Sequence, residues 1–190
     1  TFDDLADNVG RNKPGYKKIQ LCGEQAKRDG LQYFWVDTCC INKANKAEHS
    51  LAIRSMFRWY RNAARCYVYL PDVSTSPPSA GEAANSPQWD SDFRGSKWFT
   101  RGWTLQELLA PYAVEFFSYK WHKLGDRTSL KSHIYEATTI PQDVLEGAPL
   151  SQSSVEERFR WRQDRHTKLK EDAAYCLSGI FDVEMAPIYG

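Results

Sequence analysis

The stretch FRWYRNAARCYVYLP, residues 57–71, is the most informative one for the fold because its hydrophobic pattern changes from a helical period to a strand. Apolar side chains recur three or four residues apart over 47–64, so we expect an amphipathic helix there. CYVYL, residues 66–70, is a run of aromatic and β-branched residues that Pro71 ends, which predicts a buried strand. A helix followed at once by a buried strand is a building unit of α/β folds.

The same alternation recurs on both sides of this stretch. Residues 16–30 predict a helix and LQYFWVD, residues 31–37, a buried strand, while RGWTLQELLAP, 101–111, predicts a short helix and AVEFFSY, 113–119, a further strand. From residue 124 onward the pattern is mostly helical. This order predicts an α/β fold with a parallel sheet flanked by helices, followed by extra C-terminal helices.

In parallel sheets of this kind, ligands bind beyond the carboxyl ends of the strands. Asp37 and the TCCIN loop follow one predicted strand end, so this edge is the expected binding site. Residues 72–95 hold three prolines among Ser, Ala, Asn and Gly, which predicts a mobile surface loop inserted into a single domain that spans 1–190.

Composition excludes several classes of function. The 190 residues contain 25 Lys and Arg against 24 Asp and Glu, so bulk charge gives no reason to expect binding to nucleic acid or to an anionic membrane. No apolar run is long enough to span a bilayer, and we expect a soluble, cytoplasmic protein. Five cysteines without a CxxC pair and four histidines without ligand spacing predict reduced thiols and no metal site.

Glu107 has two interpretations. Thr104-x-x-Glu107 matches a capping box, in which a hydroxyl and a carboxylate satisfy free amides at a helix start. On a helical wheel, however, Leu105, Leu108 and Leu109 share one side while Trp103 and Glu107 lie nearly opposite. A carboxylate beside an indole in a cleft could stabilise a developing cation or exchange a proton. Periodicity alone does not choose between the two.

Four colinear blocks carry a family resemblance: GLQYFWVDTCCINK, AIRSMFRWYRNAARCYVYLPDV, SKWFTRGWTLQELLAP and KEDAAYCLSGIFDVEMAPIYG. Together they resemble the heterokaryon-incompatibility (HET) domain of filamentous fungi, over nearly the whole chain. The family domain usually opens with one more strand, so the resemblance implies an N-terminally truncated HET domain without its first strand.

The resemblance implies a role in non-self recognition, a form of fungal innate immunity, and in programmed cell death. HET domains are similar in turn to the Toll/interleukin receptor (TIR) domain, which has a flavodoxin-like fold. Some TIR domains cleave NAD with the Glu of a Trp-Cys-x-x-Glu-Leu helix, and Glu107 stands at that position in the segment 103–108, with Thr104 in place of the Cys. The resemblance therefore implies a TIR-like NADase with catalytic Glu107, NAD as substrate and no required cofactor.

Several residues would assist such a reaction. Trp103 or Trp98 could stack on a ring of the nucleotide, Arg101 could bind a phosphate, and Asp37 could touch a ribose hydroxyl or cap a helix instead. The block that contains Arg165 implies a residue that locks the last helix to the domain, with phosphate contact as the other option.

The alternative is a non-enzymatic death-signalling module. It would act by self-association or by binding NLR-like incompatibility proteins, which carry nucleotide-binding and repeat modules. The stripe Arg54, Arg58, Arg61 and Arg65 is either a solvated helix face or a self-association surface.

Overall fold

The computed structural model describes residues 1–13, 15–74 and 87–189. The chain divides into two compact units, Thr1–Ile53 and Arg54–Gly190. The first unit contains α1 (Phe2–Ala6), α2 (Tyr16–Arg28), α3 (Asp37–Cys40) and the start of α4 (Lys46–Asn62), which continues into the second unit. The predicted helices over 16–30 and 47–64 are thereby confirmed as α2 and α4.

The strand predicted over 31–37 is wrong. Residues 31–36 form no strand, and Asp37 begins the short helix α3. The side chains explain the error, because Tyr33 is 87% exposed and Phe34 packs beside α2, where a Cβ atom on Gly23 would lie 3.0 Å from the ring. Part of the aromatic run therefore packs against α2, and part of it faces solvent. The run pairs with no strand among the described residues.

The second unit holds a three-stranded sheet in the order β1 (Cys66–Tyr69), β2 (Val114–Phe117) and β3 (Lys123–Asp126). Strands β1 and β2 are parallel, with Cys66 opposite Val114, and every residue of the central strand β2 is buried. The α/β class and both of these strands are confirmed. The sheet is nevertheless mixed rather than wholly parallel, because β3 runs antiparallel to β2.

Strand β3 was not predicted because its sequence, KLGD, carries no strand pattern. Only Leu124 is fully buried in it. A five-residue loop, 118–122, joins it to β2, and Trp121 adopts a positive φ of 62° in that loop. The chain reverses there through the bond from the Trp121 amide to the Ser118 carbonyl, 2.8 Å long. Turn geometry, rather than side-chain character, therefore adds β3 to the edge of the sheet.

The connection from β1 to β2 contains α5 (Pro87–Arg94), the 3₁₀ helix η1 (Lys97–Thr100) and α6 (Thr104–Leu109). Helix α5 occupies part of the predicted surface loop 72–95, and its Trp89 and Phe93 are buried in the core. The loop prediction is therefore wrong from residue 87 onward. Residues 75–86 of that predicted loop lie outside the described residues.

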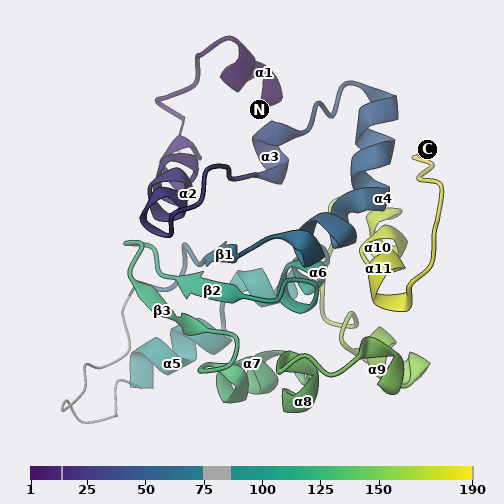
Figure 1. Ribbon diagram of the computed structural model, residues 1–190. Coiled ribbons are helices and arrows are strands. Elements are labelled where there is room, and N and C mark those ends of the chain that lie inside the picture. The colour runs from purple at the N-terminus through teal and green to yellow at the C-terminus, as the bar shows by residue number, and fades with distance from the viewer. Residues whose placement is uncertain (14, 75–86, 190) are drawn as a thin grey trace. The chain divides into compact units, whose positions relative to one another are not determined.

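After β3 the chain is helical, as expected. The elements are α7 (Lys131–Thr138), α8 (Gln142–Leu145), η2 (Leu150–Gln152), α9 (Val155–Arg160), α10 (Asp172–Tyr175) and α11 (Ser178–Phe181). Helix α7 packs between α5 and α8 below β3 in Figure 1. Residues 169–181 hold two short helices, α10 and α11.

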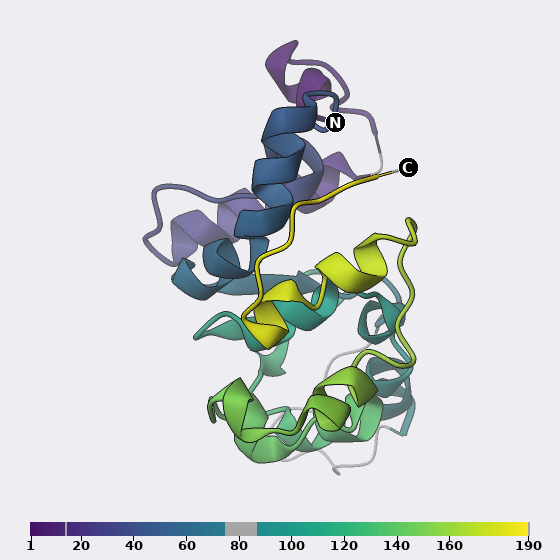
Figure 2. The same ribbon diagram turned by 90° about the vertical axis from the view of Figure 1, so that its right-hand side faces the viewer.

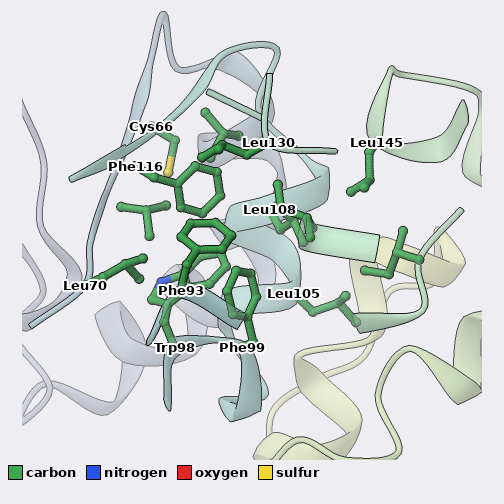
Figure 3. Close-up of a cluster of buried hydrophobic side chains, with 14 of the residues drawn as sticks. Cys66, Leu70, Phe93, Trp98, Phe99, Leu105, Leu108, Phe116, Leu130 and Leu145 are labelled. Carbon is green, nitrogen blue, oxygen red and sulfur yellow. The ribbon is translucent and has the colours of Figure 1, made fainter. Parts of the chain in front are cut away.

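The core of the second unit is built around aromatic rings. Phe93 packs edge to face on Phe99 and Phe116, and Trp98 packs in the same way on Phe116 (Figure 3). Leu105 and Leu108 of α6 join this cluster (Figure 3). Helix α6 is thus anchored through one face to the residues that cover the sheet.

Candidate functional site

The segment that leads into α6 is fixed by a chain of polar contacts. The Asp72 carboxylate accepts hydrogen bonds of 2.7 Å from the Ser96 hydroxyl and from the Lys97 amide. Ser96 in turn caps η1, because its Oγ accepts from the Trp98 amide. Asp72, a short distance after the end of β1, therefore fixes the start of the segment that ends in α6.

Helix α6 buries the side that the wheel predicted. Leu105 and Leu108 are fully buried, whereas Trp103 and Glu107 keep part of their surface exposed. Trp103 also packs against the core, so it is only partly the open residue that the wheel predicted. Glu107 lies at the middle of a helix that its leucines hold in place.

The capping-box interpretation of Thr104 and Glu107 is wrong. The helix is capped by Trp103, without a side-chain hydrogen bond, and Thr104 is already its first residue. The Thr104 hydroxyl instead lies 2.7 Å from the carbonyl oxygens of both Trp98 and Arg101, to which it can donate its proton. Thr104 therefore ties α6 to the segment before it, and Glu107 is not explained as a cap.

A buried arginine from a distant part of the chain completes this arrangement. Arg165, only 4% exposed, donates from Nη1 to the Arg101 carbonyl at 3.1 Å and to the Thr104 hydroxyl at 3.0 Å. Its Nε donates to the Trp161 carbonyl at 3.0 Å. Arg165 therefore bonds the segment before α10 to the start of α6, while its expected role of locking the last helix stays a prediction.

The charge of Arg165 is held in a poorly solvated place. Burial lowers the pKa of its guanidinium to about 10, the positive charge of Arg162 adds to that lowering, and the negative charge of Glu107 partly opposes it. The group remains a cation at neutral pH. Glu107 is therefore a partly exposed carboxylate in the electrostatic field of a buried cation.

Backbone contacts strengthen the same connection. The His166 amide donates to the Thr100 carbonyl at 2.6 Å, and the Gly102 amide donates to the His166 carbonyl at 2.9 Å. A Cβ atom on Gly102 would lie 2.5 Å from Cγ2 of Thr167, so glycine permits this close approach. The teal segment with α6 accordingly lies against the yellow C-terminal helices (Figure 2), where Gln106 donates to the Cys176 carbonyl.

The structure brings together three of the five residues predicted for the site. Arg101, Trp103 and Glu107 follow one another along a single short segment, and Arg101 is exposed. Trp98 is 8% exposed and its ring packs on Phe99 and Phe116, so stacking on a ligand would require it to leave the core.

Asp37 belongs to the other unit of the chain, where it begins α3. Its carboxylate lies 4.0 Å from Nζ of Lys43, at the limit of an ion pair. Its predicted contact with a ribose stays a prediction.

Sequence reasoning missed Gln106 and His166 as members of this region. In the sequence, Gln106 was marked only by being a polar residue among leucines. Its side-chain amide is fully buried and donates a hydrogen bond to the Cys176 carbonyl. His166 offered no signal, because its contacts with Thr100 and Gly102 are made by backbone atoms alone.

The described residues contain no group of three or more His, Cys, Asp or Glu side chains arranged to hold a metal ion. All five cysteines are free thiols. None of the helices in this part of the chain combines the length and the apolar composition that crossing a membrane requires.

Comparison with known proteins places these features in context. Residues 16–86 match the family described as "Heterokaryon incompatibility protein (HET)". The whole chain is 53% identical over 190 residues to the "Vegetative incompatibility protein HET-E-1" of Podospora anserina. The chain spans 14% of the length of that relative. No solved structure matches the chain.

Proposed function

The chain belongs to the heterokaryon-incompatibility (HET) family, and we propose that it is a cytoplasmic effector domain that triggers regulated cell death by cleaving NAD. The role in incompatibility follows from the family. The cleavage reaction is proposed from the residues of α6, by way of the likeness between HET and TIR domains.

The observation that carries the proposal is the setting of Glu107. Its carboxylate is partly exposed, it does not cap its helix, and it lies in the field of the buried cation Arg165. Leu105 and Leu108 fix the opposite side of α6 in the core. A carboxylate that is rigidly held and partly open is suited to stabilise positive charge on a bound substrate.

The proposed reaction needs a single acid. The bond between nicotinamide and C1′ of the ribose breaks with its electron pair moving to nicotinamide, which leaves as a neutral molecule. The cation that remains on the ribose is stabilised by Glu107 until water adds to C1′ and releases a proton. The products are nicotinamide, ADP-ribose and that proton. Trp103 would stack on a ring of the nucleotide and Arg101 would bind its phosphates.

The test compares Glu107→Gln with the wild type by measuring NAD loss and nicotinamide formation with concentrated protein. We expect hydrolysis to fall by about 100-fold or more, because Gln keeps the shape of Glu but removes the charge that stabilises the cation. Glu156→Gln changes an exposed acid on α9 and is the matched control. Equal thermal unfolding of all three proteins must accompany the result. Hydrolysis by Glu107→Gln at the wild-type rate would exclude this role.

A second candidate is the non-enzymatic module that acts by self-association or by binding other incompatibility proteins. It is favoured by the exposed residues Arg54, Arg58 and Arg61 along α4, with Trp59 exposed on the same helix. Arg65 is not a free member of that stripe, since it pairs with the buried Glu115 at 2.6 Å. If Glu107→Gln kills cells as the wild type does and Arg58→Glu does not kill them, the result would favour the module over the enzyme.

A further inference from the structure

Arg101 and His166, 65 positions apart, are neighbours in space. They are the partners of an isolated parallel β-bridge, made by the bonds from His166 to the Thr100 carbonyl and from Gly102 to the His166 carbonyl. Bridge partners in extended backbone direct their side chains to the same face. The guanidinium of Arg101 and the imidazole of His166 therefore project from one surface.

The flanking residues identify that surface as the solvent side. On each segment one neighbour of the pair is buried, since Gly102 lies against Thr167 and Arg165 is only 4% exposed. Arg101 and His166 themselves are exposed. Within the ranges that the structure describes, neither side chain takes part in a hydrogen bond or an ion pair. Their donors are thus available to a ligand.

The electrostatic surroundings favour an anion at this place. Arg165 contributes a buried positive charge directly below the pair, where low solvation weakens screening. Arg162 adds a second guanidinium, which donates to the Arg165 carbonyl and whose buried Nε has no partner in the described residues. Glu107, the nearby acid on the same segment, lies six residues further along, on α6.

We propose that Arg101 and His166 together bind the pyrophosphate group of a dinucleotide. Arg101 offers a planar fork of donors that matches two phosphate oxygens, and His166 offers a ring N–H group beside it. The choice of a dinucleotide rests on the function proposed above. With its pyrophosphate bound at Arg101 and His166, the attached ribose would extend along the segment toward Trp103 and Glu107. The pair would then orient the substrate, and Glu107 would act on it.

The test is isothermal titration calorimetry of the 190-residue chain with three probes: inorganic pyrophosphate, ADP-ribose and adenosine. Wild-type protein should bind the first two more tightly than adenosine, which lacks phosphate. Arg101→Gln should weaken the binding of pyrophosphate and of ADP-ribose by about tenfold, because it removes charged hydrogen bonds. His166→Ala should weaken the binding of both by about fivefold, because it removes one hydrogen bond. Arg101→Lys keeps the charge but loses the fork, so it should bind at an intermediate level.

Arg160→Gln, an exposed arginine on α9, is the matched control and should bind as the wild type does. Because the bridge uses backbone atoms only, none of these substitutions should alter thermal unfolding, which is measured in parallel. Unchanged pyrophosphate binding in both Arg101→Gln and His166→Ala would overturn the site. So would wild-type protein that binds adenosine as tightly as ADP-ribose.

The two proposals fail in different ways. If pyrophosphate binding depends on Arg101 and His166 while NAD is not hydrolysed, the site stands and the enzymatic function fails. If hydrolysis depends on Glu107 while its KM is the same in Arg101→Gln and His166→Ala, the function stands and the pyrophosphate site fails.

Discussion

Glu107 is one of the charged groups whose field acts on the buried guanidinium of Arg165. Arg165 is buried, and its guanidinium donates hydrogen bonds to two carbonyl oxygens and to the Thr104 hydroxyl. All three acceptors are uncharged. The charge of Glu107 offsets part of what burial costs the guanidinium. A change at Glu107 therefore affects any bound cation and Arg165 together, which is why activity and unfolding have to be measured on the same variant.

A pH-dependent contribution to stability is expected at Asp126, the last residue of β3. Its Oδ1 accepts from the Ser129 amide at 2.8 Å and the Thr128 amide at 3.0 Å, and these bonds lower the pKa of the carboxyl below its ordinary value of 3.8. A carboxylate with a lowered folded pKa stabilises the protein above its unfolded pKa, and loses this effect as pH falls through the folded value.

Asp126→Asn keeps the oxygen acceptor and removes the charge. At pH 7 it should lower the free energy of unfolding by up to about 1 kcal/mol, because bonds to a charged acceptor are stronger than bonds to a neutral one. The difference from wild type should shrink below pH 4. Urea unfolding of both proteins at pH 7, 5 and 3 measures it, and a difference that stays constant across this range would contradict the assignment.

Among the helices and strands, the sequence predicted correctly those whose hydrophobic pattern matches their burial in the fold. Strands β1 and β2 were predicted because a strand buried on both faces is a continuous apolar run, and α4 because its apolar stripe is long. The segment 31–37 has the composition of such a strand, yet it forms none, since composition does not reveal whether a partner strand is present. Strand β3 shows the converse, because a turn and backbone pairing create it from polar sequence.

The contact between α11 and α4 depends on a missing side chain. A Cβ atom on Gly179 would lie 2.3 Å from Cβ and 2.1 Å from Cγ of Phe57, which are too close to the main chain to move away. Gly179→Ala should therefore force the helices apart and lower the free energy of unfolding by about 1–3 kcal/mol. Gly15→Ala, whose new Cβ would meet no atom within 4 Å, is the control. Denaturant unfolding that finds Gly179→Ala as stable as wild type would refute this packing.

For the molecule as a whole, the candidate site could be predicted only in part. Arg101, Trp103 and Glu107 were predicted from their residue types, from their neighbouring positions in sequence and from the resemblance to TIR domains. Their connection to Arg165 and His166 was largely hidden, because it is made mainly to main-chain carbonyls and amides more than 60 positions away. Main-chain acceptors look the same at every residue, so such a partner leaves no trace in a single sequence.

The unequal cores of the two units lead to a prediction about local stability. All the largest fully buried side chains lie in Arg54–Gly190, whereas the buried apolar residues of Thr1–Ile53 are few and mostly small: Ala26, Val36, Cys39, Ile41, Ala52 and Ile53. Less apolar burial means a smaller free energy of opening.

Hydrogen exchange measured by mass spectrometry should therefore find the amides of α2 exchanging through openings of lower free energy than those of β2. Low concentrations of denaturant distinguish the two cases, because global unfolding exposes more surface and responds more steeply to denaturant than a local opening. Exchange in α2 should respond weakly and exchange in β2 strongly. Equal free energies with equal denaturant dependence would instead mean that the chain opens cooperatively as the single domain expected from its sequence.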